Sequence, residues 1–388
     1  MKKLTVVGKG AVGSLAVAHF LHYTDWNIEW IFDEKIPTAS VGEATNLSVP
    51  NNLNSTLNFN NYDLIKMNGT TKLGISKKGW GKQDYFHPFP SGLSAIHFEA
   101  KKLQDSIYDK VKNNSRLTIK NDHVNNPEDL DSDFVMMCVG SPKKANKDEF
   151  VVLSSIPVNS AYVTQCEWDY PKFQYSLTDA MPDGWVFGIP LQNRISIGYM
   201  YNNKFTTLEQ VKKDVQKVFK DYNLTPSEKT TELHFESYYR KKNFTPKVVY
   251  NGNASFFLEP LEATSTGLSV SIIRKAWDLW HGTLTIEECE KEYKKEINEI
   301  ESMILLHYMA GSKYNSTFWK HAKKIGKEKI QKEFNNRTEW AKFVLDSAIG
   351  MYQFQEPKEM GTWGYVNYEI NIKNLGLIKE IKKLGGLL

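Results

Sequence analysis

The glycine-rich stretch Gly8–Gly13 is the feature that most constrains how this chain can fold. It follows a short apolar run, Leu4–Val7, that is typical of a buried strand, and it precedes a helical pattern. A second strand is predicted at Ile28–Phe32 and ends directly before Asp33. A strand, a glycine turn, a helix and a second strand in this order predict a βαβ opening, and therefore an α/β fold.

The positions of the glycines in this turn predict a dinucleotide site. Gly8 permits a tight turn, Gly10 lets the backbone approach a pyrophosphate, and Gly13 allows the helix to lie close to the strand. Asp33 can accept a hydrogen bond from a ribose hydroxyl, and the phosphates would lie at the positive end of the helix. The turn alone does not distinguish NAD from FAD.

The rest of the chain alternates strand and helix signals before it becomes mainly helical from about residue 285. Ala161–Cys166 and Ile195–Tyr201 alternate as half-exposed strands do, and Phe98–Val111 has a helical pattern. Two capping boxes predict where further helices begin, at Thr207 with Gln210 and at Thr285 with Glu288.

Composition excludes several classes of protein. The formal charge of +4 over 388 residues is small, and the lysines are scattered, so nucleic acid is not expected as a partner. No apolar run approaches the roughly 20 residues that span a bilayer, so no membrane is expected. Cys138, Cys166 and Cys289 match no zinc or CxxC spacing and favour a reducing cytoplasm. His19 and His22 lack acidic neighbours at ligand spacing, so we predict no metal site.

Several further motifs follow one another in a fixed order. They are Val41–Thr45, Thr71–Ile75 with Trp80, His87-Pro88-Phe89, Gly184–Pro190, Gly252-Asn253-Ala254 leading into Glu259–Ser265, His307-Tyr308, and Asn315–Trp319. Together with the glycine turn, this series resembles the flavin-dependent halogenases of the tryptophan-halogenase type. The resemblance runs from residue 4 to about residue 320, and its strength lies in the preserved order and spacing of the motifs.

The resemblance implies an α/β fold in which an FAD-binding Rossmann-like domain carries an added mixed β-sheet and a shortened helical C-terminal region. We expect residues 1–284 to form the FAD-binding and substrate-sheet module, and residues 285–388 to form a helical substrate cap. Within the module, the dinucleotide core would come from 1–50, 92–145 and 246–284, and the substrate-side sheet from 51–91 and 150–245.

The resemblance also assigns the cofactor and the halide. Reduced FAD, supplied by a separate flavin reductase, would use oxygen to oxidise a halide ion to hypohalous acid. Backbone amides around Thr264 and Ser265 would hold the halide. The FAD contacts would be Gly8, Gly10, Gly13, Asp33, Gly42, Glu43, Ala44, Thr45, Gly252 and Asn253.

The catalytic pair implied by the resemblance is Lys72 and Glu262. Lys72 would hydrogen-bond the hypohalous acid as an ammonium, or be halogenated as a neutral amine, and Glu262 would accept the proton lost from the aromatic ring. Taken alone, a lysine in a Thr-Lys-Leu strand usually faces solvent, and a glutamate after Pro-Leu is usually a cap or a surface acid. Residues expected to line the tunnel and the indole- or phenol-like substrate are Trp80, Phe86, His87, Phe89, Trp185, Phe187, Ile189 and Pro190.

The chain departs from the family pattern at several positions. Phe187 replaces a tryptophan, Ala263 and Ser265 replace a serine and a glycine, and Met137 stands where an acid is usual. The shortened C-terminal region argues for a more open pocket, for varied aromatic substrates in place of tryptophan, and for bromide or iodide. In these respects the chain resembles compact phage-type or marine-type members of the family. The sequence leaves open whether the protein is a homo-oligomer.

Three alternatives stay open at this stage. A flavin-dependent aromatic hydroxylase would share the fold, yet it would oxidise NAD(P)H within the same chain and would need no halide. A catalytically silent flavin-binding protein would bind FAD without halogenating any aromatic compound. An NAD-dependent dehydrogenase would show no preference for flavin over nicotinamide.

Overall fold

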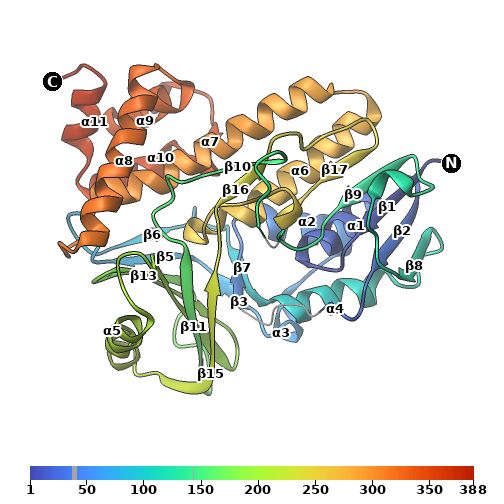
Figure 1. Ribbon diagram of the computed structural model, residues 1–388, viewed down its shortest axis with the longest axis horizontal. Coiled ribbons are helices and arrows are strands. Elements are labelled where there is room, and N and C mark those ends of the chain that lie inside the picture. The colour runs from blue at the N-terminus through green and yellow to red at the C-terminus, as the bar shows by residue number, and fades with distance from the viewer. Residues whose placement is uncertain (37–41, 143) are drawn as a thin grey trace. The chain divides into compact units, whose positions relative to one another are not determined.

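The computed structural model describes residues 1–36, 42–142 and 144–388, which form two compact units, each assembled from three stretches of chain (Figure 1). Unit 1 comprises Met1–Thr71, Ser94–Leu153 and Glu236–Lys295. Unit 2 comprises Lys72–Leu93, Ser154–Phe235 and Glu296–Leu388. Val41, the first residue of the predicted flavin-side motif, lies outside the described residues.

Unit 1 is built on a parallel sheet of five strands in the order β17-β9-β1-β2-β8. Its strands are β1 (Lys3–Val7), β2 (Asn27–Phe32), β8 (Leu117–Asn121), β9 (Phe134–Met137) and β17 (Val248–Tyr250). Helix α1 (Ala11–Tyr23) connects β1 to β2, drawn in blue in Figure 1. Because β1 lies in the middle of the sheet and pairs in parallel with β2, the predicted βαβ opening and the Rossmann-like fold are confirmed.

Smaller sheets and helices complete unit 1. Strands β3 (Gly42–Ala44), β7 (Ala95–Glu99) and β4 (Thr70–Lys72) form one sheet, in which the last residue of β4 already belongs to unit 2. Strands β10 (Phe150–Val152), β16 (Tyr238–Arg240) and β18 (Phe256–Phe257) form another. The helices and turns are α2 (Ser48–Leu57), α3 (Asn61–Lys66), α4 (Ala100–Val111), η1 (Pro127–Asp129), η2 (Gly252–Ala254), η3 (Leu261–Ala263) and α6 (Thr264–His281). The helix predicted from Phe98 begins instead at Ala100, because residues 95–99 pair with β3 as a strand.

Unit 2 contains a seven-stranded mixed sheet in the order β15-β11-β14-β13-β12-β5-β6. Strands β5 and β12 are parallel, and the other neighbouring pairs are antiparallel. The strands are β5 (Gly74–Lys78), β6 (Tyr85–Pro88), β11 (Ser160–Glu167), β12 (Ser176–Met181), β13 (Gly184–Pro190), β14 (Arg194–Tyr201) and β15 (Thr225–His234). This is the added mixed sheet that the sequence resemblance predicted.

Both faces of the middle of this sheet are covered. Helix α5 (Leu208–Asp221) packs on one face, where Val211 and Val215 meet Ile197 of β14. On β13, neighbouring side chains point to opposite faces. Val186 therefore belongs to the α5 side, while Trp185 donates its indole N–H to Tyr308 of α7. The prediction that Ala161–Cys166 and Ile195–Tyr201 are half-exposed is wrong, because both strands lie inside the sheet. Residues 195–201 are all buried, and residues 161–166 are buried except for Gln165.

Helices form the C-terminal part of unit 2, as the sequence predicted. The elements are α7 (Ile286–Ala310), whose first residues belong to unit 1, α8 (Thr317–Asn335), α9 (Glu339–Ile349), η4 (Met351–Phe354), β19 (Glu359–Met360), β20 (Trp363–Gly364), α10 (Tyr365–Leu375) and α11 (Ile378–Leu384). The capping box at Thr285 is confirmed, because Thr285 accepts from the amide of Glu288 and the Glu288 carboxylate accepts from the amide of Thr285. At Thr207 the side chain caps the helix by accepting from the amide of Gln210, while the Gln210 side chain donates to Asp214. Over the described ranges, no helix combines the length and apolar character needed to cross a bilayer.

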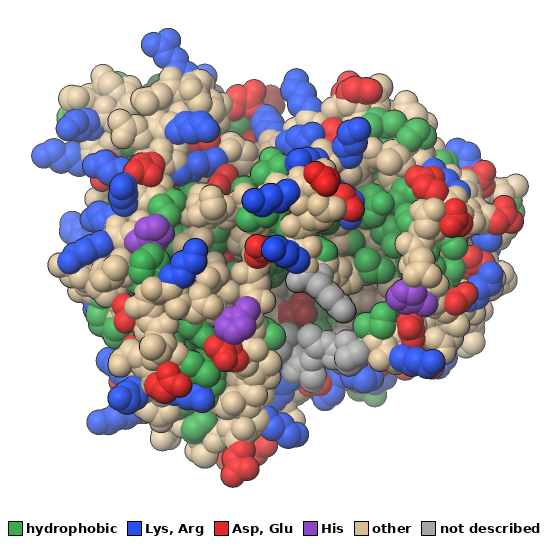
Figure 2. Space-filling model, viewed as in Figure 1, with side chains coloured by type: hydrophobic (Ala, Val, Ile, Leu, Met, Phe, Trp, Pro, Cys, Tyr) green, Lys and Arg blue, Asp and Glu red, His purple; other side chains and the backbone are tan. Residues whose placement is uncertain are grey.

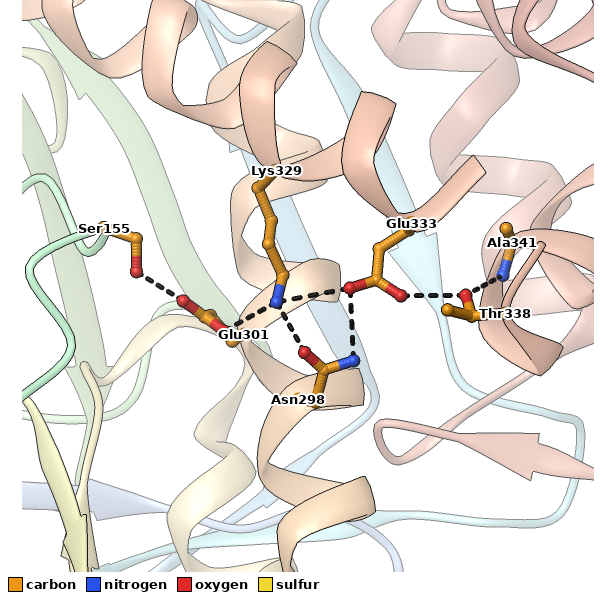
Figure 3. A network of polar contacts seen from close by, with 7 residues as sticks. All are labelled: Ser155, Asn298, Glu301, Lys329, Glu333, Thr338 and Ala341. Atoms are coloured by element: carbon orange, nitrogen blue, oxygen red, sulfur yellow. Dashed lines mark hydrogen bonds and ion pairs between the residues drawn. The ribbon is translucent and has the colours of Figure 1, made fainter. Parts of the chain in front are cut away.

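A polar network centred on Lys329 joins α7 to α8 (Figure 3). The Lys329 ammonium lies 2.8 Å from a Glu301 carboxylate oxygen and 3.3 Å from one of Glu333. Asn298 accepts from the same ammonium at 2.5 Å. The network continues beyond each carboxylate. Ser155 donates a hydrogen bond to Glu301, and Thr338, at the start of α9, donates one to Glu333. One cation thus compensates two buried carboxylates at the junction of three helices.

Replacing Lys329 with methionine should therefore lower the stability of the protein. The change leaves two largely buried carboxylates facing each other without their cation, a loss of about 3 kcal/mol. Urea denaturation, followed by tryptophan fluorescence, measures it. The matched control is Lys324→Met on the same helix, whose exposed ion pair with Glu328 at 3.9 Å should contribute less than about 1 kcal/mol. Equal denaturation midpoints for the two variants would contradict this interpretation of the network.

Acidic and basic side chains are interspersed over the face of the molecule shown in Figure 2. Such mixing produces no extended field of one sign on that face.

Candidate active site

The glycine turn of unit 1 has the geometry of a dinucleotide-binding loop. Gly8 has φ +112°, and a Cβ atom there would lie 2.4 Å from the carbonyl oxygen of Cys138. A Cβ atom on Gly13 would lie 2.1 Å from the carbonyl oxygen of Gly8. Around Gly10, in contrast, a Cβ atom would meet nothing within 4 Å among the described residues. Gly8 and Gly13 therefore allow tight packing, while Gly10 presents open backbone at the N-terminus of α1.

Other predicted cofactor residues surround this turn within unit 1. Asp33 directly follows β2, and its carboxylate accepts from the amide of Lys35 at 2.9 Å. Gly252 has φ +57°, and a Cβ atom there would lie 3.2 Å from the side chain of Val12, the second residue of α1. The carbonyl of the next residue, Asn253, accepts from Tyr238 at 2.7 Å. The open backbone at Gly10, the acid after β2 and the η2 turn against α1 are the parts that a dinucleotide such as FAD requires, so these residues fit it.

The predicted flavin-side motif forms β3 and the residue after it. Glu43 pairs with Phe98 of β7, and Thr45 is anchored to Ile96 by hydrogen bonds of 2.9 Å and 3.1 Å. The side chain of Glu43 keeps intermediate exposure, yet protein atoms crowd its carboxyl closely enough that burial raises its pKa to about 7. Glu43 thus titrates close to neutral pH, with the protonated form favoured below that value.

Replacing Gly10 with valine should weaken FAD binding by about tenfold or more. The new side chain enters the open space beside the turn, so the fold tolerates it, but it obstructs the approach of a pyrophosphate to the backbone. Fluorescence titration of the apoprotein with FAD measures the dissociation constant, and the melting temperature confirms folding. Gly10→Ala should give an intermediate effect. A valine variant that binds FAD as tightly as the wild type would argue against this site.

The Glu262–Thr264 segment is strained and ends at a helix N-terminus. Glu262 has φ +66° and Ala263 φ +54°, two consecutive left-handed conformations in residues that carry a Cβ atom. Such conformations cost of order 1 kcal/mol or more each and concentrate at functional sites. Helix α6 begins at Thr264, and its N-cap is Ala263, whose methyl group cannot accept from the first-turn amides. The first turn of α6 is thus suited to an anion.

In unit 2, Lys72 lies in an aromatic setting. Its side chain is only 1% exposed, and its ammonium nitrogen lies 5.4 Å from the centre of the Phe89 ring. His87, on β6, is fully buried, and its ring lies 5.3 Å from that of Trp363 at an angle of 78°. Phe86 points to the opposite face of the strand, where it is exposed and packs on Tyr175.

Trp363 is the residue that sequence reasoning missed. It is buried, and it lies between Gly361 and Gly364, about forty positions beyond the last motif that the sequence comparison had matched. A single tryptophan between two glycines in a polar stretch is the signal that could have indicated it. The structure brings Trp363 beside His87. We call the rings of His87, Phe89 and Trp363 the aromatic wall, and Trp363 is its residue from the C-terminal region.

A second group of large aromatic residues is buried in the interior of unit 2. Trp80 is fully buried and donates to the carbonyl of Thr178 at 3.2 Å, and its ring lies 5.1 Å from Trp319 and 6.3 Å from Trp185. Trp185 donates to the Tyr308 hydroxyl at 2.9 Å. The motifs around residues 185, 308 and 319 therefore meet in one place. Trp80 and Trp185 occupy the interior of this cluster.

Phe187, which replaces a family tryptophan, lies against a glycine of the neighbouring strand. It pairs with Gly198 of β14, and a Cβ atom there would lie 2.1 Å from the Phe187 ring. Only glycine at position 198 leaves room for the ring in this position. Further along β13, Ile189 and Pro190 are buried.

The candidate residues divide between the two units. The predicted FAD and halide residues lie in unit 1 with Glu262, while Lys72, His87 and Trp363 lie in unit 2 with the tunnel residues. The pairing of Lys72 with Glu262 is therefore carried forward as part of a proposal. Among the described residues, no group of three or more His, Cys, Asp or Glu side chains is arranged to hold a metal ion.

Comparison with known proteins identifies the family. The tryptophan halogenase family model matches residues 3–125 and 101–360, and the chain therefore belongs to the tryptophan halogenase family. The chain is 22% identical over 269 residues to the tryptophan 7-halogenase RebH of Lentzea aerocolonigenes. That match covers 65% of this chain and 50% of RebH, so the chain spans about half the length of this relative.

Solved structures of the family share the fold. A tryptophan halogenase from Shewanella frigidimarina superposes with a TM-score of 0.76 at 16% identity, covering 100% of this chain and 93% of that one. BrvH, a flavin-dependent halogenase from Brevundimonas sp. BAL3, gives a TM-score of 0.75 at 17% identity, covering 100% and 94%. These likenesses confirm the predicted fold class.

Proposed function

We propose that this protein is a flavin-dependent halogenase that uses reduced FAD, oxygen and a halide ion to halogenate an indole- or phenol-like aromatic compound. The observation that carries the proposal is the burial of Lys72. A lysine at the end of a short strand would ordinarily extend into solvent, whereas this one is 1% exposed with its ammonium over Phe89. An ammonium held in an aromatic pocket suits a group that handles an electrophile next to a planar substrate.

FAD would be held by the glycine turn, Asp33, the β3 strand and the η2 turn, all in unit 1. When bound and reduced by a separate flavin reductase, FAD supplies with oxygen the two-electron oxidation that converts a halide ion to hypohalous acid and water. The chain contributes the halide site. The first-turn amides of α6, at Thr264 and Ser265, donate to the halide, and the strained turn before them fixes their direction.

Lys72 and Glu262 then direct the electrophile. The Lys72 ammonium donates a hydrogen bond to the hypohalous acid and draws electron density from the halogen, or its neutral amine carries the halogen covalently. With the ammonium, the ring carbon bonds to the halogen as the oxygen–halogen bond breaks, and the hydroxide takes a proton from Lys72 and leaves as water. With the halogenated amine, water has left when the nitrogen–halogen bond formed, and that bond breaks as the ring carbon takes the halogen. Glu262 accepts the proton released from that carbon, which restores aromaticity. Burial of both side chains keeps water from competing with the substrate.

His87, Phe89 and Trp363 are proposed as the walls that hold the substrate ring. Aromatic rings favour edge-to-face and offset-stacked packing around a planar ligand. Trp185, Phe187, Ile189 and Pro190 are proposed to line the path from the cofactor, with Trp80 supporting them from the interior, and Phe86 is assigned to the outer rim. The side chains assigned to these walls carry aromatic rings or apolar groups, which favours a neutral aromatic compound.

The proposal is tested with purified protein, FAD, a flavin reductase and NADH. Chloride, bromide and iodide are each supplied with a panel of indoles and phenols, and product masses are read. A halogenated product that requires both reductase and halide supports the proposal. Oxygenated product without halide, or NADH oxidation by the protein alone, would indicate a hydroxylase. FAD binding without any product across the panel would indicate a silent flavoprotein.

A further inference from the structure

Lys77 is a second buried lysine on the strand that follows Lys72, and the proposed reaction does not use it. Its side chain is 0% exposed, whereas that of the next residue, Lys78, is exposed. An ammonium is costly to bury unless hydrogen bonds or other interactions compensate its lost hydration. The contacts of Lys77 therefore indicate what this position is needed for.

Two hydrogen bonds tie Lys77 to the helical C-terminal region of unit 2. Its ammonium nitrogen lies 2.6 Å from Nε2 of His307 and 2.7 Å from Oδ1 of Asn371. Nδ1 of His307 lies 3.0 Å from the carbonyl oxygen of Met303, which can only accept, so the ring proton is on Nδ1 and Nε2 accepts from Lys77. Tyr85 donates to the same Asn371 oxygen at 2.7 Å. Lys77 thus holds α7 and α10 against the β5–β6 strands.

One route leads from Lys77 directly to the aromatic wall. Its ammonium nitrogen lies 5.0 Å from the centre of the Trp363 ring, within the range of a cation–π contact. The rings of His307 and His87 each lie 5.3 Å from the same Trp363 ring. Replacing Lys77 would therefore remove the cation–π contact that supports one side of the Trp363 ring.

A second route leads through α10 to His87. Asn371 donates to the carbonyl of Asn367 at 2.8 Å. The Asn367 side-chain oxygen accepts from the amide of Gly364 at 3.1 Å, so its amide nitrogen is the atom that faces Nε2 of His87 at 2.9 Å. An amide nitrogen can only donate, which requires Nε2 of His87 to accept and places the ring proton on Nδ1. Asn367 thus fixes both the orientation and the tautomer of His87.

We propose that Lys77 is a positioning residue that sets the His87–Trp363 wall and thereby selects which ring carbon of the aromatic substrate meets Lys72. The inference rests on the proposed function for its chemistry. A displacement of about 1 Å between reacting groups can change a rate by about 10²-fold. A small shift of the wall would therefore redistribute the product among ring positions while FAD binding in unit 1 stays the same.

The test compares Lys77→Met with Lys329→Met in the full-length holoenzyme, supplied with reductase, a halide and indole. Lysine 329 is also a buried lysine of unit 2, but its contacts with Asn298, Glu301 and Glu333 lie outside the wall. Lys77→Met should change the ratio of halogenated indole isomers by about tenfold or more, and it should increase hydrogen exchange in peptides from residues 359–376. Lys329→Met should leave the isomer ratio unchanged. Because it lowers the stability of the protein as a whole, any rise in its exchange should be spread over the protein and should not be concentrated in residues 359–376.

A second variant, Asn367→Asp, tests the route to His87 without removing a buried lysine. The aspartate still accepts from the Gly364 amide, and an acid suits the first turn of α10, so the fold is retained. It cannot donate to His87, so the ring proton moves to Nε2, which nitrogen-15 spectra of the imidazole report. The isomer ratio should change with it.

The outcomes separate this inference from the proposed function. An unchanged isomer ratio in folded Lys77→Met and Asn367→Asp would overturn the inference while the halogenase proposal stands. Wild-type protein that yields no halogenated product would overturn the proposed function. In that case, two other measurements decide whether Lys77 positions the wall: hydrogen exchange over residues 359–376 and the affinity for indole, measured by fluorescence. Equal values in Lys77→Met and wild type would overturn the positioning role of Lys77.

Discussion

Replacing Lys72 with methionine should reduce halogenated product by about 10²–10³-fold, with FAD binding unchanged. Methionine matches the length of lysine and suits the buried, aromatic surroundings, so the fold should be retained. What is lost is the amine that binds or carries the electrophile, and removing one such donor commonly costs 10²–10³ in rate. Product mass after a fixed time, with the FAD dissociation constant as the folding control, measures the effect.

A second substitution at the same position separates the two roles open to Lys72. Arginine keeps a permanent cation that donates hydrogen bonds, but its guanidinium does not lose a proton readily. Partial activity in Lys72→Arg would favour the hydrogen-bonded hypohalous acid, and complete loss would favour the halogenated amine. Free hypohalous acid, trapped by an added diketone, should still appear in Lys72→Met because the proposed halide residues, Thr264 and Ser265, lie in unit 1. Full activity in Lys72→Met would refute the assignment of this residue.

Replacing Glu262 with glutamine should slow product formation by about 10²–10⁴-fold. Glutamine keeps the size of the side chain, so the left-handed turn and the start of α6 should be preserved, while the carboxylate that accepts the ring proton is lost. Steady-state kinetics with the best substrate of the panel measures the change in kcat. Binding of FAD and of halide should be nearly unaffected.

A deuterated substrate gives an independent check on Glu262. In the wild type, a placed base removes the ring proton quickly, so deuterium at the reacting carbon should matter little. In Glu262→Gln, proton loss becomes slow, and a primary isotope effect should emerge. If activity falls without an isotope effect, Glu262 acts on the halide or on the turn, and its role as a proton acceptor is wrong.

Local patterns were enough to predict the elements whose structure depends on nearby residues. The Gly8–Gly13 turn, the strand before it and the helix caps at Thr207 and Thr285 are short-range features, since their steric and hydrogen-bonding reasons lie within a few positions. The close packing predicted for Gly8 and Gly13 has the same local cause, because a Cβ atom at either position would clash with a backbone carbonyl oxygen. The ordered motifs extended this to the family fold.

Features that depend on distant segments escaped prediction for physical reasons. The alternation in Ile195–Tyr201 indicated one solvent-exposed face, but β14 lies inside a seven-stranded sheet and is buried on both faces, and no residue within the strand indicates that its second face is covered. The contacts of Lys77 and Trp363 form only when the α10 region packs against β5 and β6, so they could not be predicted from nearby residues. Burial of Lys72 likewise depends on Phe89, seventeen positions away. Pairing of Lys72 with Glu262 remains a prediction.

The interleaving of the two units has a consequence for biosynthesis. Each unit collects segments from the beginning, the middle and a later part of the chain, and the last segment of unit 2 is residues 296–388. Unit 1 therefore lacks its last segment until residue 295 has been made, and unit 2 until the end of residues 296–388, so partly made chains expose unpaired strand edges for longer than a serial arrangement would. Low growth temperature and chaperone supply should raise the yield of native protein, whereas expressing either unit from a single contiguous fragment should fail.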